Sequence, residues 1–138
     1  MKLNPLIKTY GDPTYRGDCP KEDAELITAV NWLRRTYPDT LGALTLHIEN
    51  EGKRTMAQAA MAKAKGLKTG AVDLLVLVTP PLVLEIKRQD HTKSSWQKGQ
   101  QEFMLAAQQH GAFVGLCLGA EGVKEAVQCY LKPSTKTT

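Results

Sequence analysis

VDLLVLVTPPLVLEIK, residues 72–87, is the stretch that decides the expected fold. Two apolar runs, 72–78 and 82–86, stand on either side of Thr79-Pro80-Pro81. Their β-branched content and close spacing are typical of two strands joined as a hairpin. We therefore expect them to be central strands of a sheet.

Elements of both kinds are expected around this hairpin. Apolar residues recur at helical spacing from Lys21 to about Tyr37, and Pro38 ends that helix. Apolar and polar residues alternate over 44–48, which predicts a half-buried strand. The other expected elements are helices over 55–65, from Ser94 or Ser95 to about His110 and over 121–131, and a buried strand over 112–118. Their order predicts an α/β fold, a mixed central β-sheet flanked by helices.

Length and composition indicate one domain. The chain has 138 residues and is 42% hydrophobic, enough for one ordinary core. Three prolines and two glycines within 1–20 predict an extended N-terminal arm without regular structure, which packing elsewhere could order in part. The folded domain is expected over 21–131, and the polar segment 132–138 is expected to be a flexible tail.

Several classes of protein are disfavoured. No apolar run approaches the roughly 20 residues that a bilayer requires, and the first residues lack a secretory signal, so a cytoplasmic protein without a membrane partner is expected. Three widely spread cysteines suit free thiols in a reducing cytosol better than a disulfide framework or a zinc site. A formal charge of +4 permits attraction to a polyanion but identifies none.

Asp73, Glu85 and Lys87 are the candidate catalytic residues. The hairpin can bring them together, and Glu85 and Lys87, two residues apart on one strand, project from the same face. Two hard carboxylates can recruit Mg²⁺ to activate water and to stabilise charge on a phosphate. The lysine could orient or deprotonate that water, or neutralise the developing charge; both roles stay open.

An acidic residue two positions before a lysine on a strand often occurs by chance and only marks a solvent-exposed edge of a sheet. Asp73 and Glu85, however, interrupt apolar runs, where a carboxylate without a partner or metal is costly. This context favours the functional interpretation. Basic residues flank these acids in three clusters: Lys53 and Arg54; Lys63, Lys65 and Lys68; and Lys87, Arg88, Lys93 and Lys98.

Further motifs occur in a characteristic order over about 23–131. They are Glu25 seven residues before Trp32, Tyr37-Pro38, IENEGKR at 48–54, Gly66, GAVD at 70–73, LEIK at 84–87, and Gln100 eleven residues before Gly111. This order resembles the virus-type replication-repair nuclease (VRR-NUC) domain of the PD-(D/E)xK superfamily, which has a restriction-endonuclease-like core. The chain departs from that family at Val72, where a proline is usual, and at Glu51, which interrupts an Asn-Gly-Gly pattern.

The resemblance implies a Mg²⁺-dependent endodeoxyribonuclease, with Mn²⁺ able to substitute. Asp73, Glu85, the backbone carbonyl of Ile86 and Glu25 would hold the metal, Lys87 would be the catalytic lysine, and Gln100 would reach the site. Glu22, one helical turn before Glu25 on roughly the same face, is the nearest alternative to it. The residues expected to contact DNA are Asn50, Lys53 and Arg54 by the resemblance, and Lys63, Lys68, Arg88, His91 and Lys93 by their position near the site.

The resemblance also implies a stand-alone homodimeric enzyme that acts on branched DNA such as Holliday junctions and leaves a 5′-phosphate. Two alternatives stay open. One is a DNA-binding module that kept the fold and lost cleavage. The other is a sequence-specific restriction-type nuclease, for which so short a chain leaves little room.

Overall fold

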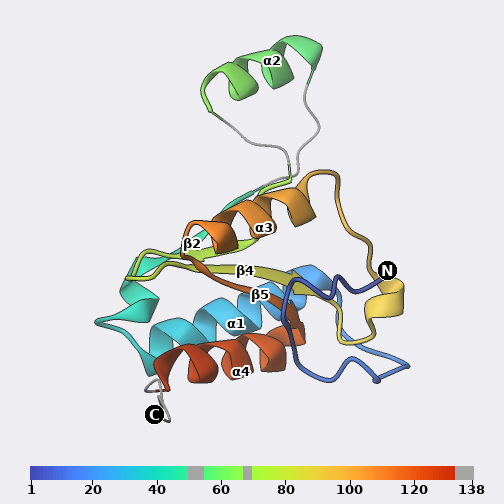
Figure 1. Cartoon of the computed structure of the whole chain (residues 1–138), viewed down its shortest axis with the longest axis vertical. Coiled ribbons are helices and arrows are strands. Elements are labelled where there is room, and N and C mark those ends of the chain that lie inside the picture. The colour runs from blue at the N-terminus through green and yellow to red at the C-terminus, as the bar shows by residue number, and fades with distance from the viewer. Residues whose placement is uncertain (50–54, 67–69, 133–138) are drawn as a thin grey trace.

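A mixed β-sheet forms the centre of the molecule (Figure 1). The computed structural model describes residues 1–49, 55–66 and 70–132. Within them the strands lie in the order β1-β5-β4-β3-β2, and β3 is antiparallel to both β2 and β4, while β5 is parallel to β4 and β1. Their bounds are Thr9–Tyr10 (β1), Thr45–His47 (β2), Leu74–Val76 (β3), Leu82–Lys87 (β4) and Phe113–Leu118 (β5). The predicted hairpin and mixed α/β sheet are confirmed.

Helices cover both faces of the sheet (Figure 1). The helices α1 (Glu22–Thr36) and α4 (Gly119–Leu131) lie on one face, and α3 (Gln100–Gln109) lies on the other. All six residues of β4 are buried: Leu82, Leu84 and Ile86 belong to the core under α1 and α4, and Val83 belongs to the core under α3. The same alternation places Glu85 and Lys87 on the α3 side.

Three short elements complete the described fold. Two are turns of 3-10 helix, η1 (Leu41–Leu44) and η2 (His91–Lys93). The third is α2 (Met56–Ala64), which has no buried residue and stands away from the sheet (Figure 1). None of the helices within the described ranges is long and apolar enough to cross a membrane.

The N-terminal arm contains regular structure, contrary to the sequence-based expectation. Its strand β1 pairs in parallel with β5, and Leu116 N donates to Lys8 O at 2.9 Å. Ile7 and Tyr10 are buried. The arm is ordered because it supplies partners to β5 backbone groups that would otherwise remain unpaired.

Two predicted helix starts are wrong. The helix expected from Ser94 or Ser95 begins only at Gln100, after Gly99 in the left-handed conformation. Ser94 does not act as its cap because Ser94 Oγ accepts a hydrogen bond from Arg88 N at 3.0 Å. The last helix begins at Gly119, directly after β5, instead of at Glu121. Of the predicted tail, residues 133–138 lie outside the described part of the chain.

Candidate active site

Strand pairing brings the two acids together. The antiparallel register sets Leu74 opposite Leu84, so Asp73, just before β3, lies beside Glu85. Asp73 N donates a hydrogen bond to Glu85 Oε1 at 3.0 Å, and Ile86 N donates to Asp73 Oδ2 at 3.0 Å. Each carboxylate is thus held by the backbone of the other strand.

The Lys87 ammonium completes this group. The side chain is buried, and its Nζ atom lies 3.1 Å from Glu85 Oε2. Nζ also donates to Ser95 O at 2.8 Å and to Gln100 Oε1 at 3.1 Å. These three partners match the three N–H donors of an ammonium group. Lys87 is therefore held in one orientation next to Glu85.

Gln100 links the lysine to the glutamate. Its Nε2 donates to Glu85 Oε2, while its Oε1 accepts from both Lys87 Nζ and Gln97 N. Gln100 is 2% exposed and lies in the first turn of α3. The structure therefore places it in contact with the acid and the lysine, as the sequence-based expectation required of its position.

Glu85 has a strongly perturbed acidity. Burial raises its pKa to about 9, and the neighbouring Asp73 carboxyl adds to this shift by its negative charge and by a hydrogen bond between the two side chains. The Lys87 ammonium opposes the shift in part. Without a divalent cation, the pair of acids therefore retains a proton near neutral pH.

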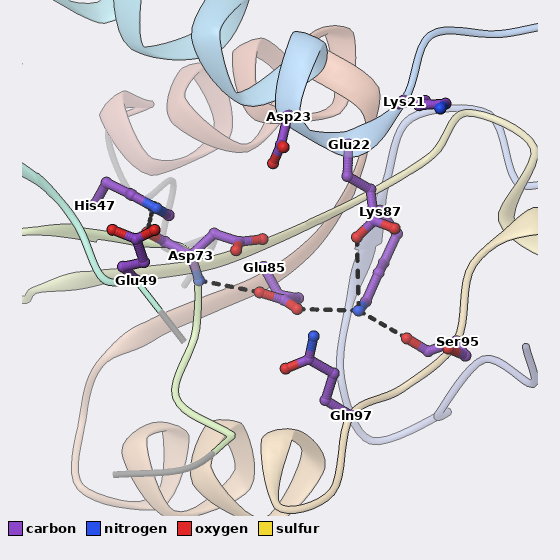
Figure 2. Close-up of a pocket in the computed structure, with 10 residues that line it drawn as sticks. All are labelled: Lys21, Glu22, Asp23, His47, Glu49, Asp73, Glu85, Lys87, Ser95 and Gln97. Atoms are coloured by element: carbon purple, nitrogen blue, oxygen red, sulfur yellow. Dashed lines mark hydrogen bonds and ion pairs between the residues drawn. The ribbon is translucent and has the colours of Figure 1, made fainter. Parts of the chain in front are cut away.

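These groups open into one polar cavity of about 400 Å³ (Figure 2). Figure 2 shows Glu22 and Asp23 pointing into it from α1. The lining residues are Lys21, Glu22, Asp23, His47, Glu49, Asp73, Glu85, Lys87, Ser95 and Gln97. Five of these ten side chains are carboxylic acids, so the cavity favours cations over phosphate unless part of that charge is neutralised.

A comparison with solved structures gives a match to the fold of this chain. One structure, described as a "VRR_NUC domain protein", superposes with a TM-score of 0.68 over 83% of this chain and 90% of that chain, at 22% sequence identity. The chain has the fold of a VRR_NUC domain protein. Neither family models nor curated protein sequences give a match. The resemblance seen in the sequence is thus confirmed at the level of the fold.

Within the VRR_NUC fold, Glu25 and Glu22 occupy different environments. Glu25 is buried but does not line the cavity; its Oε2 accepts a hydrogen bond from Gln89 Nε2 at 3.2 Å. A Cβ atom on Gly119 would lie 2.2 Å from that oxygen, so the carboxylate rests against the start of α4. Glu22 Oε1 instead lies 3.8 Å from Lys87 Nζ. Glu22, and not the expected Glu25, is therefore the acid of α1 that faces Lys87.

The basic residues expected at DNA have varied positions. Arg88 and Lys93 donate to backbone carbonyls of the N-terminal arm, and His91 is only 8% exposed, with Nδ1 3.1 Å from Met1 O. Lys63 is exposed on α2. Asn50, Lys53, Arg54 and Lys68 lie outside the described residues. Contact of any of these residues with DNA stays a prediction.

Other cavity residues were not selected from the sequence. His47 has no metal-ligand spacing, but β2 pairs with β3 and brings His47 Nδ1 to 2.9 Å from Asp73 O. Because a carbonyl oxygen only accepts, Nδ1 carries the hydrogen and Nε2 is the other polar atom of the ring. Glu49 follows two residues later. The signal for His47 was its place on the strand that neighbours the hairpin, and for Glu49 its place just after the end of that strand.

The donors present fit a hard divalent cation. Asp73 and Glu85 offer carboxylate oxygens at the wall of a polar cavity. Within the described ranges, no group of three or more acidic, histidine or cysteine side chains is assembled as a metal site. Mg²⁺ commonly binds through one or two carboxylates and keeps several waters, so it suits such a pair better than a cation that needs a protein cage.

Proposed function

We propose that this protein is a metal-dependent nuclease that hydrolyses phosphodiester bonds in DNA. The observation that carries the proposal is the convergence of Asp73, Glu85 and Lys87 in one polar cavity. The likeness of the fold to a VRR_NUC domain protein supports it.

Asp73, Glu85 and the carbonyl of Ile86 would hold Mg²⁺, or Mn²⁺ in its place. When bound, such an ion would supply Lewis-acid charge for the phosphate and would make a water molecule more acidic. Glu85 must release its proton before it can act as a ligand, because a carboxylate binds metal in its ionised form. Glu22, which lines the same cavity, is a further carboxylate for the site in place of Glu25.

Lys87 supplies positive charge beside the metal ligands. Its three hydrogen-bond partners are acceptors, and two of them, Ser95 O and Gln100 Oε1, are uncharged. An ammonium held in this way is preorganised to stabilise negative charge that develops on a phosphate. Gln100 orients the lysine and Glu85 together through both ends of its amide.

Phosphate binding depends on neutralising the cavity. Its five acids outnumber the basic side chains, which are Lys21, His47 and Lys87. Bound Mg²⁺ would reduce this negative charge, and contacts with neighbouring phosphates would come from surface lysines such as Lys63. We further propose branched DNA, such as a four-way junction, as the substrate and a homodimer as the active form, because two sites can then act on two strands.

The test compares cleavage of a synthetic four-way junction and a linear duplex, each with Mg²⁺ and with EDTA. The wild-type protein should cut only with Mg²⁺ and should prefer the junction. Asp73→Ala and Glu85→Ala should abolish cleavage while retaining DNA affinity. Asp39→Ala, which changes an exposed acid that does not line the cavity, serves as the matched control and should cut normally.

Other outcomes contradict parts of the proposal. Wild-type turnover in either cavity variant would refute the assignment of the acids. Binding without cleavage in every lane would identify a DNA-binding module. Cleavage of linear duplex at one sequence would identify a restriction-type enzyme. Light scattering on the same samples measures the mass and tests the homodimer.

A further inference from the structure

The segment 88–99, between β4 and α3, determines how Lys87 is held. Apart from the short turn η2, it contains no helix or strand. It supplies Ser95 O, and it leads directly into Gln100, so two of the three partners of the ammonium depend on its position. Whatever anchors this segment therefore sets the orientation of Lys87.

The N-terminal arm anchors the first half of this segment. Arg88 Nη2 donates to Cys19 O at 2.6 Å, and Arg88 Nε donates to Pro20 O at 3.2 Å. Gly17 is bound twice: its N–H donates to Asp90 Oδ2 at 3.1 Å, and its carbonyl accepts from Lys93 Nζ at 2.8 Å. Side chains spaced along the segment thus hold consecutive parts of the arm.

Trp96 connects the arm to the ammonium itself. Its Nε1 donates to Lys2 O at 2.8 Å, and the centroid of its ring lies 6.0 Å from Lys87 Nζ. The ring also packs with the core under α3. At this distance the ring face attracts the ammonium, so a shift of Trp96 changes the surroundings of Lys87 directly.

We propose that the N-terminal arm is a positioning element of the active site, with Arg88 and Trp96 as the positioning residues that tie it to Lys87. The functional part of this inference rests on the proposed nuclease activity. The arm acts by keeping the Ser95 carbonyl and the Trp96 ring in place beside the ammonium. Arg88 suits this role because its Nε and Nη2 atoms both bind backbone carbonyls of the arm.

Steady-state kinetics on junction DNA test the proposal. Arg88→Ala should lower kcat by about 100-fold, the loss expected when a reacting group is displaced by roughly 1 Å, with KM and its salt dependence unchanged. Trp96→Phe keeps a ring beside Lys87 but loses the bond to Lys2, so a decrease of about 10-fold in kcat is expected. Arg88→Lys should not restore activity, because an ammonium cannot reproduce the fork to two carbonyls.

Gln108→Ala is the matched control. Gln108 Nε2 donates to Leu6 O at 3.0 Å, so the variant loses a side-chain bond to the same arm, but one that does not involve segment 88–99. Its kcat should equal that of the wild type. A raised KM with weaker salt dependence and an unchanged kcat in Arg88→Ala would overturn the proposal, because it is the signature of a phosphate contact. Equal losses in all variants, in parallel with their melting temperatures, would also overturn it.

A spectroscopic measurement separates this inference from the proposed function. The chain has two tryptophans, so Trp32→Phe leaves Trp96 as the only tryptophan, and its fluorescence is excited at a wavelength that the tyrosines do not absorb. If the wild type cleaves nothing, the nuclease assignment fails, yet the anchoring is still tested. In this background, acrylamide should quench the Trp96 fluorescence more strongly after Arg88→Ala, whereas Gln108→Ala should leave the quenching unchanged. Equal quenching in Trp32→Phe and in both double variants would refute the anchoring.

Discussion

Replacing Glu85 by glutamine should remove most of the pH dependence of stability above pH 5. Burial and the Asp73 carboxyl raise the pKa of Glu85 from 4.5 to about 9. The folded protein then keeps a proton that the unfolded chain releases above pH 4.5. This contribution to stability is complete below pH 4.5 and is lost as the pH rises towards 9.

The size of the effect follows from proton linkage. A difference of one proton between the folded and unfolded states changes the free energy of unfolding by roughly 1.4 kcal/mol per pH unit. Between pH 5 and 8 the wild type should therefore lose on the order of 4 kcal/mol that Glu85→Gln does not lose. Acids with a lowered pKa do not interfere; Asp90, whose pKa the Thr92 hydroxyl lowers to about 2, titrates below this range.

Urea denaturation at pH 5, 6, 7 and 8, in EDTA and at constant ionic strength, measures this difference. Glu121→Gln is the matched control, because the Glu121 side chain is 77% exposed and should give the wild-type pH dependence. Parallel curves for the wild type and Glu85→Gln would refute the reasoning, since Glu85 would then be ionised in the folded state without metal.

Three further outcomes are expected. Mg²⁺ should raise the melting temperature more at pH 8 than at pH 6, because binding displaces the Glu85 proton, and a calorimetric scan showing no rise at either pH would contradict the metal site. Gly119→Ala should lower the free energy of unfolding by about 3 kcal/mol, because φ is +72° and the added Cβ would lie 2.2 Å from a buried carboxylate oxygen. Gly111→Ala is the control and should lower it by about 1 kcal/mol, because its Cβ meets nothing within 4 Å. Equal urea midpoints for the two variants would contradict the clash. Leu33→Ala on α1 should lower the free energy of unfolding by about 3 kcal/mol, because Leu33 is fully buried. Ile27 is 62% exposed on the same helix, so Ile27→Ala should lower it by less than about 0.5 kcal/mol. Similar denaturation curves for the two variants would contradict the packing of this helix.

Local periodicity explains what could be predicted. The apolar runs around Thr79-Pro80-Pro81 correspond to β3 and β4, and α1 begins and ends within a residue or so of the expected bounds. Side-chain alternation is a property of any strand, so Glu85 and Lys87 had to share a face once their strand was recognised. The hairpin then left Asp73 little freedom to lie elsewhere.

Residues whose role depends on distant partners could not be predicted in this way. Ser94 resembles a helix cap in sequence, but its hydroxyl is engaged by Arg88 N, and the helix starts later. Glu22 and Glu25 differ by less than one helical turn, and only the packing of α1 against α4 decided which of them faces the lysine.

The sequence by itself determined the α/β class, the central hairpin and the shared face of Glu85 and Lys87, because these follow from the period of a strand and the chemistry of a turn. Only the tertiary structure decided that β1 pairs with β5, that His47 joins Asp73 and that the arm anchors the segment beside Lys87. Each of these is a contact between segments far apart in the chain. Such contacts are selected by the burial and hydrogen bonding of the whole fold, which local patterns do not encode.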